Sequence, residues 1–348
     1  MSTTTNEADR QSLPPRRRWG RRLLKGLLYS LVGLLLLVGA VLIFFRGQAA
    51  LRETKTGFEV APQTGRFVRA GDVEIFIQEV GPASGSVVLF IHGTGAWSEI
   101  WREPMEVLAA AGFRTIALDL PPFGFSERPS NATYGRQAQA KRIIGVLDAL
   151  NIPQATLVGH SFGAGPTVEA TLLAPDRVER LVLVDAALGL TLPGEPPRRQ
   201  SPVVRGLLGV RPLRTALVAA TATNPRLTKM LLEGLILDPA DATDTQITML
   251  QQQLVIQDSS EALGDWMLAF LTPQAALSNN LAAYATLAMP TLIIWGDSDT
   301  IVPLTHGEYL ADVIPKAKLV VLKQVGHIPH IEEVDLFIEV MLSFLAKP

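Results

Sequence analysis

The chain has 348 residues, which is enough for one large domain or two ordinary ones. Its formal net charge of −2 gives no sign of a nucleic-acid partner. The sequence contains no cysteine, which excludes a thiol nucleophile, a disulfide framework and cysteine-based zinc sites. Hydrophobic residues make up 48% of the chain, and part of this excess lies in one block near the N-terminus.

The N-terminal segment has the pattern of a single membrane anchor. Residues 1–22 form a tail that ends in clustered arginines, and an uncharged run follows from Gly26 to Phe45. About twenty helical residues span about 30 Å, which is the thickness of a bilayer's hydrocarbon core. A buried helix of a globular domain would have a polar face, and this run has none. We therefore expect a transmembrane helix over 23–45, uncleaved because the run is longer than the apolar region of a signal peptide.

The charges on either side of this run predict its orientation. Six basic residues precede the run, whereas three basic residues and one glutamate follow it closely. The positive-inside rule then leaves the N-terminus in the cytoplasm and puts the catalytic part on the outer, periplasmic or extracellular, face. A twin-arginine export signal is a minor alternative, because Gly-Arg-Arg-Leu-Leu-Lys at 20–25 matches it only partly. Residues 46–64 mix charge with Thr, Gly and Pro, and we expect them to form a tether.

From residue 65 onward, short apolar runs alternate with helical stretches. Arg66–Val80 predicts a β-hairpin with Ala-Gly-Asp at its turn, and Arg136–Leu150 has apolar residues at helical spacing. Apolar runs typical of strands buried in a parallel sheet lie at Val87–Ile91, Thr115–Leu118, Ala155–Val158, Leu181–Val184, Thr291–Trp295 and Leu319–Leu322. The alternation predicts an α/β fold with a doubly wound, mostly parallel sheet, built from residues 65–188 and 287–348.

One long interval interrupts this alternation. Between Val184 and Thr291 no run reads as a convincing strand, and several helices are expected, for example Leu227–Leu237 and Thr245–Ile256. Active sites of open α/β sheets lie at the carboxyl ends of the strands, where such an insertion would sit. We therefore expect residues 189–286 to form a helical cap that shapes the substrate pocket.

The motif Gly-His-Ser-Phe-Gly at 159–163 is the strongest chemical signal in the chain. It follows the predicted strand Ala155–Val158 and opens a helical stretch that ends near Leu173. A serine in a tight strand-to-helix turn, with small residues two places before and after it, is typical of a nucleophile elbow. An ordinary glycine-rich turn is the alternative. The strand–turn–helix context favours Ser161 as a catalytic nucleophile.

From about Arg66 to its C-terminus, the chain resembles the α/β-hydrolase superfamily, in particular its capped esterases and C–C-bond hydrolases. The resemblance rests on the elbow and on four further segments in the family order: Ile-His-Gly-Thr-Gly at 91–95, Asp-Leu-Pro-Pro-Phe-Gly-Phe-Ser at 119–126, Trp-Gly-Asp-Ser-Asp-Thr-Ile-Val-Pro at 295–303 and Val-Gly-His at 325–327. It implies the α/β-hydrolase fold, with the acid and the histidine of a catalytic triad both C-terminal to the cap.

A serine hydroxyl is a weak nucleophile that needs a base, and the base needs an orienting carboxylate. The resemblance places the catalytic imidazole at His327, just after the last predicted strand, and His330 is the close rival. In Gly-x-x-Asp loops of this family the later aspartate usually orients the histidine. Asp299 is therefore preferred to Asp297, which is expected to bond within its own loop.

The remaining motif residues divide into an oxyanion hole and loop supports. The backbone N–H groups of Thr94 and Phe162 are the expected donors to a tetrahedral intermediate's oxyanion. His92 and His160 are interpreted as side chains that hold their own loops. Asp119 is interpreted as structural, because family members with an aspartate nucleophile carry it at the elbow, where this chain has serine.

The serine narrows the expected reaction. Haloalkane dehalogenases and epoxide hydrolases of this fold attack with aspartate, and C–C hydrolases usually have Asn before the nucleophile and Trp after the histidine. This chain has His160 and Ile328 at those two positions. The sequence thus predicts a membrane-anchored serine hydrolase that cleaves an apolar carboxylic ester, thioester or lactone through an acyl-enzyme, with no cofactor or metal.

Two alternatives stay open. One is a C–C-bond hydrolase or cofactor-free perhydrolase that uses the same triad. The other is a non-catalytic, membrane-tethered binding protein, although a binding module has no need of a complete triad and oxyanion loop. The expected partners are a small-molecule substrate and, through the anchor, membrane lipid.

Overall fold

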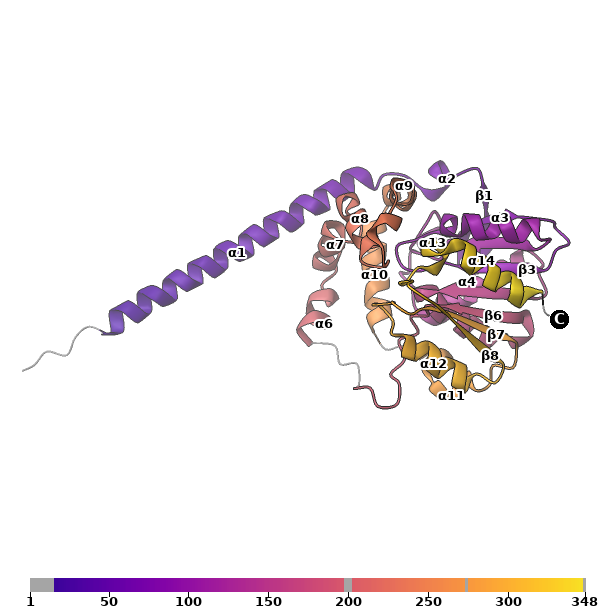
Figure 1. Cartoon of the computed structure of the whole chain (residues 1–348). Helices are drawn as coiled ribbons and strands as arrows, with labels where there is room; N and C mark the ends of the chain where they lie inside the picture. Colours follow the sequence, from indigo (N-terminus) through magenta and orange to yellow (C-terminus); the bar gives the residue numbers. More distant parts are fainter. Residues whose placement is uncertain (1–15, 197–201, 273–274, 347–348) are drawn as a thin grey trace, which may run out of the picture. The chain divides into compact units, whose positions relative to one another are not determined.

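The computed structural model describes residues 16–196, 202–272 and 275–346. The chain divides into two compact units, Met1–Phe44 and Phe45–Pro348. Most of the first unit is the helix α1 (Arg16–Arg52), which continues into the second unit (Figure 1). Among the described residues, α1 is the one helix long and apolar enough to cross a membrane, between Leu23 and Arg52. Most of its large apolar side chains between Leu23 and Phe44 are exposed.

The expected tether over 46–64 is ordered instead of loose. Residues 46–52 are the last turns of α1, and Ala49 is fully buried within the second unit. A short helix, α2 (Gly57–Val60), follows, and the Glu59 carboxylate accepts a hydrogen bond from Thr56 N at 2.6 Å in a capping box. The mixed composition of this stretch suggested a loop because composition does not reveal the cap residues to which the stretch binds.

An eight-stranded sheet forms the centre of the second unit (Figure 1). Its strand order is β1-β2-β4-β3-β5-β6-β7-β8, with antiparallel pairs at β1–β2 and β2–β4 and parallel pairs elsewhere. The strands are β1 (Gly65–Ala70), β2 (Val73–Val80), β3 (Val87–Ile91), β4 (Arg114–Leu118), β5 (Ala155–His160), β6 (Val178–Val184), β7 (Thr291–Gly296) and β8 (Ala317–Leu322). The predicted hairpin and the predicted mostly parallel sheet are both confirmed.

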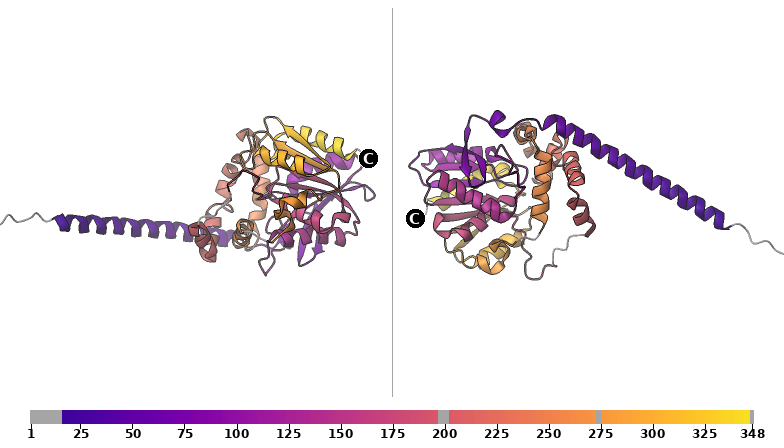
Figure 2. Two further views of the ribbon diagram at one scale, coloured as in Figure 1. Left: turned by 90° about the horizontal axis from the view of Figure 1, so that it is seen from below. Right: turned by 180° about the vertical axis from the view of Figure 1, so that it is seen from behind.

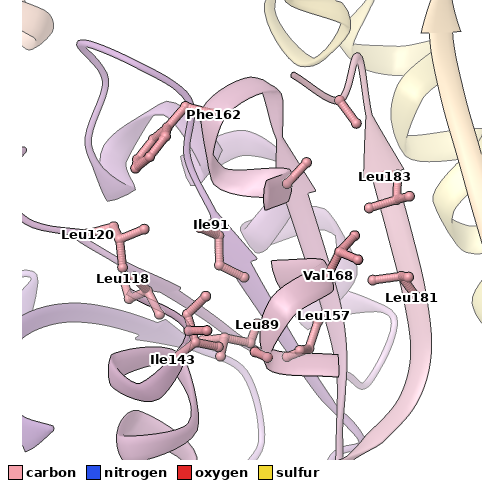
Figure 3. Packing of buried hydrophobic residues seen from close by; sticks show 14 of the residues in the cluster. Leu89, Ile91, Leu118, Leu120, Ile143, Leu157, Phe162, Val168, Leu181 and Leu183 are labelled. Atoms are coloured by element: carbon pink, nitrogen blue, oxygen red, sulfur yellow. The ribbon is translucent and has the colours of Figure 1, made fainter. Parts of the chain in front are cut away.

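Helices cover both faces of this sheet, because neighbouring residues of a strand point to opposite sides. Leu89 and Leu157 pack with the apolar cluster under α4, α5 and α12 (Figure 3), whereas Val88 and Val158 pack with the cluster under α3 and α14. The core helices are α3 (Arg102–Ala110), α4 (Arg136–Ala149), α5 (Ala164–Leu173), α12 (Leu304–Val313), α13 (Pro329–Glu332) and α14 (Val334–Leu345). Burial on both faces explains why these strands read as unbroken apolar runs.

The interval between β6 and β7 is helical throughout its described elements, as predicted for a cap. Figure 2 shows most of these helices, in red and orange, gathered on one side of the sheet. The cap helices are α6 (Pro202–Gly209), α7 (Arg211–Ala220), α8 (Thr228–Glu233), α9 (Asp244–Gln251), α10 (Ser259–Leu271) and α11 (Leu281–Tyr284). The two helices predicted over 227–237 and 245–256 are shorter in the structure, and the second ends in a 3-10 turn, Gln252–Val255.

Candidate active site

Ser161 lies at the turn between β5 and α5, in the strained backbone of an elbow. Its φ of +49° is in the left-handed region. Residues with a Cβ rarely adopt this backbone conformation, and those that do are often found at functional sites. The flanking glycines leave no room for side chains. A Cβ at Gly159 would lie 2.6 Å from Thr167 Oγ1, and one at Gly163 would lie 2.4 Å from His92 O. The close backbone approach therefore explains the glycine at each flank of the motif.

The structure brings the three predicted triad residues together. His327 Nε2 lies 2.8 Å from Ser161 Oγ, and His327 Nδ1 lies 2.8 Å from Asp299 Oδ2. Nδ1 donates to the carboxylate, so Nε2 is left to accept the serine proton. These atoms come from loops after β5, β7 and β8, which meet at the same edge of the sheet because the strands are parallel. The arrangement has the geometry of a nucleophile, a base and an orienting acid.

The two candidate aspartates have different surroundings. Asp299 Oδ1 accepts hydrogen bonds from the N–H groups of Ile301 and Val302 at 2.7 and 3.0 Å, which leaves Oδ2 for His327. Burial acts to raise the pKa of Asp299, but the hydrogen bond from His327 and these amides outweigh it and hold the pKa below its ordinary value. Asp297 instead accepts from Ser298 Oγ at 2.9 Å in its own loop and from Gln324 N at 2.8 Å in the turn after β8. The choice of Asp299 is consistent with this geometry.

A third carboxyl group lies beside Asp299. Asp185 is fully buried at the end of β6, where its Oδ1 accepts a hydrogen bond from Gly296 N at 3.0 Å. Burial and the neighbouring charge of Asp299 raise the pKa of Asp185 well above its ordinary value. Two ionised carboxylates at this spacing would repel each other, and the raised pKa avoids that repulsion.

His92 and His160 are loop supports, as interpreted from the sequence. His92 Nδ1 donates to Gly93 O at 2.8 Å and its Nε2 accepts from Leu120 N at 2.9 Å, so both nitrogens of the neutral ring are used. His160 Nε2 donates to His327 O at 2.8 Å. Burial lowers the pKa of His92 to about 4 and that of His160 to about 3. Neither ring carries charge at neutral pH.

His330, the rival base, does not reach the serine. Its ring is 2% exposed and stacks on Trp101 with 3.9 Å between the ring centroids. Among the described residues neither ring nitrogen has a hydrogen-bond partner. Burial, followed by the neighbouring rings of His160 and His327, lowers the pKa of His330 well below its ordinary value. His330 is thus a neutral packing residue.

The predicted oxyanion donors lie on either side of the elbow. Thr94 is exposed in a turn that closes from Ala96 N to Gly93 O at 3.4 Å, and no hydrogen bond within the described part of the chain uses the Thr94 N–H. Phe162 is the second residue of the short 3-10 turn Ser161–Gly163, where a helix N–H lacks an intrahelical acceptor. Both amides are available to a ligand. The loop support Asp119 accepts from Ser98 N and Phe125 N, each at 2.7 Å.

The cap closes over this site. Ser161 is 7% exposed and His327 is 2% exposed. Trp266 of α10 packs edge-on against Phe162, with 4.9 Å between the ring centroids, and also contacts Phe123. A narrow pocket between cap and core is lined by residues from both, among them Gly95, Phe123, Arg128, Thr223, Gln253 and Leu263.

Two residues that bond to the catalytic loops were not identified from the sequence. Glu332 accepts hydrogen bonds from Gly326 N and Ile328 N, on either side of His327, and from Leu237 N of the cap, at 2.8, 2.9 and 2.8 Å. Gln253 of the cap donates a hydrogen bond from Nε2 to Gly95 O in the oxyanion loop, which is the loop after β3 that carries Thr94. A glutamate in a short C-terminal helix and a glutamine in a helical stretch carry no motif, so a single sequence gives no signal for either.

The site also contains three potential metal ligands. In the described residues, Asp185, Asp299 and His327 form the one group of His, Asp and Glu whose ligand atoms lie within 4.8 Å of one another. The hydrogen bond between His327 Nδ1 and Asp299 Oδ2 already uses two of these atoms. The group is accordingly a hydrogen-bonded part of the triad.

Comparisons with known proteins agree with this fold. Residues 86–334 match the family model described as the α/β hydrolase fold. The 2-hydroxymuconate semialdehyde hydrolase of Pseudomonas sp. (strain CF600) is 33% identical over 297 residues, which cover 82% of this chain and 95% of that protein.

Solved structures share the same architecture. A meta-cleavage product hydrolase from Pseudomonas fluorescens IP01 is 27% identical, with a TM-score of 0.64 over 81% of this chain and 97% of that one. A membrane phospholipase A described as a bacterial virulence factor is 24% identical, and its fold matches with a TM-score of 0.64 over 92% of this chain and 98% of that chain. From the extent of the family match and the identity to its curated members, the chain belongs to the α/β-hydrolase fold family.

Proposed function

We propose that this chain is a serine hydrolase that breaks a bond at a carbonyl carbon, with Ser161, His327 and Asp299 as its triad. The observation that carries the proposal is the unbroken hydrogen-bonded path from Ser161 Oγ through both nitrogens of His327 to the Asp299 carboxylate. A packing role would not require a serine with positive φ to face an imidazole oriented by a carboxylate.

The geometry suggests the order of steps. Ser161 Oγ attacks the carbonyl carbon while its proton passes to His327 Nε2, and Asp299 stabilises the imidazolium that forms. The N–H groups of Thr94 and Phe162 stabilise the negative oxygen of the tetrahedral intermediate, each contributing about 3 kcal/mol to lowering the barrier. His327 then gives the proton to the leaving group. Water, activated by the same imidazole, hydrolyses the acyl-enzyme.

For the bond that is broken, we propose hydrolysis of a C–C bond in a substrate of the 2-hydroxymuconate semialdehyde type as the first candidate. The support is the 33% and 31% identity to two proteins named 2-hydroxymuconate semialdehyde hydrolases, each covering 82% of this chain. The meta-cleavage product hydrolase structures add to this support.

Ester hydrolysis is the second candidate, and two positions of the site favour it. C–C hydrolases usually have Asn and Trp where this chain has His160 and Ile328. Here His160 is 3% exposed and its Nε2 donates to His327 O, and Ile328 is an apolar side chain that is 3% exposed, so neither position has the polar side chain that is usual in C–C hydrolases. The aromatic side chains of Phe162, Trp266 and Phe270 form an apolar wall beside the elbow that suits an apolar acyl or alcohol group.

Two assays test the proposal. A fluorophosphonate probe should label the wild type and fail to label Ser161→Ala, whose kcat should fall by about four to six orders of magnitude. Labelling that persists in Ser161→Ala would remove the proposed nucleophile. The kcat/KM for 2-hydroxymuconate semialdehyde is then compared with that for p-nitrophenyl esters of increasing chain length. A kcat/KM at least tenfold higher for either substrate class decides between the two candidates. A folded wild type with neither turnover nor labelling would support the alternative of a non-catalytic binding protein.

We further propose that the segment 23–45 anchors the chain in a membrane, with the N-terminus in the cytoplasm and the catalytic unit on the outer face. The length, composition and exposed apolar side chains of α1, together with the basic residues before it, support this. The full-length chain should stay in the membrane fraction after alkaline carbonate and leave it in detergent. The double variant Leu35→Asp and Val38→Asp should become extractable, because each buried charge costs about 3 kcal/mol at the centre of a bilayer.

A further inference from the structure

Gln253 is a cap residue whose side chain binds two loops of the core. It lies at the start of the bridge segment, which we define as residues 252–260, from the end of α9 to the first two residues of α10. The residue is 5% exposed, its Nε2 donates to Gly95 O at 2.7 Å, and its Oε1 accepts from Gly124 N at 2.7 Å. A buried carboxamide paired at both ends to backbone groups has a single orientation.

The first of these contacts fixes the oxyanion loop. Gly95 has a φ of +77° and follows Thr94 in the turn that Ala96 N closes onto Gly93 O at 3.4 Å. A hydrogen bond of that length restrains the turn weakly, whereas the bond from Gln253 is short. The Gly95 carbonyl and the Thr94 N–H lie in the same four-residue turn, so holding the carbonyl also directs the N–H.

The second contact ties the oxyanion loop to its neighbour. Asp119 already connects the two loops farther on, since its carboxylate accepts from Ser98 N and Phe125 N. Gln253 connects the same two loops at earlier residues of each, Gly95 and Gly124. The oxyanion turn is thus held at one end by a core side chain and at the other by a cap side chain.

The backbone next to Gln253 is bound by residues at the end of α1 and just after it. The N–H groups of Thr54 and Lys55 donate to Val255 O at 3.0 and 3.1 Å, and Arg52 Nε donates to Leu254 O at 3.0 Å. The Glu53 carboxylate accepts hydrogen bonds from the N–H and the hydroxyl of Ser260. The bridge segment therefore lies between the residues that follow the N-terminal helix and the oxyanion loop.

We propose that Gln253 is a positioning residue that aims the Thr94 N–H at the oxyanion, so that the oxyanion hole is complete only when the cap is seated on the core. The proposal rests on the proposed role of Thr94, and it holds for either bond class. Loss of the Gln253 contacts alone would leave Ser161, His327 and Asp299 in contact with one another and would still lower transition-state stabilisation.

The test compares Gln253→Met with Gln251→Met in the full-length chain. Gln251 is a matched control because it lies two residues away and its Nε2 donates to Pro225 O, within the cap. Activity is measured on p-nitrophenyl butyrate or 2-hydroxymuconate semialdehyde, whichever the wild type turns over faster. We expect Gln253→Met to lower kcat about 10- to 100-fold with KM within threefold, and Gln251→Met to stay within about twofold.

A boronic acid that forms a tetrahedral adduct with the serine supplies the second readout. Its affinity should fall in Gln253→Met by the same factor as kcat/KM, while binding of an uncharged ground-state inhibitor stays unchanged. Gln253→Glu keeps the acceptor for Gly124 N but sets a carboxylate against Gly95 O, so it should lose at least as much activity and serves if Gln253→Met does not fold. Equal losses in the Gln251→Met control, or unchanged kcat and boronate affinity in a folded Gln253 variant, would overturn the proposal.

Hydrogen exchange separates this inference from the proposed function. Gln253→Met should speed amide exchange in the peptides that cover 91–97 and 120–126, and it should leave the exchange of β5 unchanged. This measurement needs no turnover, so it remains decisive if the wild type proves inactive. Unchanged exchange at 91–97 would show that Gln253 does not hold the oxyanion turn.

Discussion

The nucleophile elbow and the cap meet at Ser161, but different kinds of interaction hold them in place. The elbow is held by strands that are buried on both faces of the sheet. It is also held by glycines at which a Cβ would overlap backbone atoms. The cap is attached to the catalytic loops by apolar contacts, such as those of Ile256 with Trp97 and Phe125, and by specific hydrogen bonds.

These hydrogen bonds are specific and few. Gln253 binds the oxyanion loop, His327 N donates to Leu235 O at 2.9 Å, and Glu332 accepts from Leu237 N. A single hydrogen bond contributes about 1 kcal/mol net, whereas burial of a large apolar side chain contributes about 2 kcal/mol. The comparison teaches that the elbow depends on the core, whereas the oxyanion and histidine loops also depend on hydrogen bonds from the cap.

The largest expected effect tests the core side of this comparison. Asp299→Asn should lower kcat by about 10³- to 10⁴-fold, because an amide cannot stabilise the imidazolium or hold the required tautomer of His327. Asp297→Asn is the matched control, since Asp297 bonds to Ser298 and Gln324 and not to His327, and its kcat should stay within about threefold. Steady-state kinetics on both variants checks the assignment. A larger loss in Asp297→Asn would reverse it.

A smaller effect is expected where the cap and the histidine loop meet. Glu332→Gln replaces a carboxylate that accepts three N–H groups, so it should lower the free energy of unfolding by about 2 kcal/mol. It should also lower kcat on the order of tenfold, because the loop on either side of His327 loosens. Urea denaturation and kinetics measure the two effects. Glu333→Gln, an exposed neighbour, should change neither; a similar loss there would show that charge alone matters.

The smallest effect concerns stability at low pH. His330 has a pKa well below 6.5 in the folded chain, so acidification below pH 6.5 protonates the unfolded chain first and favours unfolding. The cost of this one residue is about 1.4 kcal/mol for each pH unit below 6.5, as long as the folded ring stays neutral. His160 and His327 are the titratable groups that face it. His330→Phe keeps the ring beside Trp101 and removes this cost.

Chemical denaturation at pH 7.5 and pH 5.0 makes the comparison. The wild type should lose more stability between the two pH values than His330→Phe does, by about 2 kcal/mol. The difference between the chains isolates His330, because Asp119, whose pKa burial raises to about 6, acts in the opposite direction in both. Equal losses in the two chains would mean that His330 is charged or exposed in the folded state.

Much of the fold could be predicted because its signals are local. Strands buried on both faces appear as continuous apolar runs, and the elbow appears as a serine between obligatory small residues after such a strand. The order of the motifs then placed His327 and Asp299 in the triad through family resemblance. The choice of Asp299 over Asp297 had no local basis, and the hydrogen bond to His327 Nδ1 is what distinguishes them.

Other features could not be predicted, since they depend on contacts between distant parts of the chain. The stretch 46–64 reads as a loose linker until the cap residues that bind it are known, and His330 reads as a rival base until its stack on Trp101 is seen. Glu332 and Gln253 carry no motif, although each supports a catalytic loop.

The sequence by itself determined the sheet, the strained turn at Ser161 and the apolar N-terminal helix, because steric fit and hydrophobic burial act between near neighbours and repeat with a period. The tertiary structure alone decided which side chains hold the catalytic loops. Gln253 and Gly95 are 158 residues apart, and a hydrogen bond across that distance leaves no pattern in either segment, because its geometry exists only after the cap has folded onto the core.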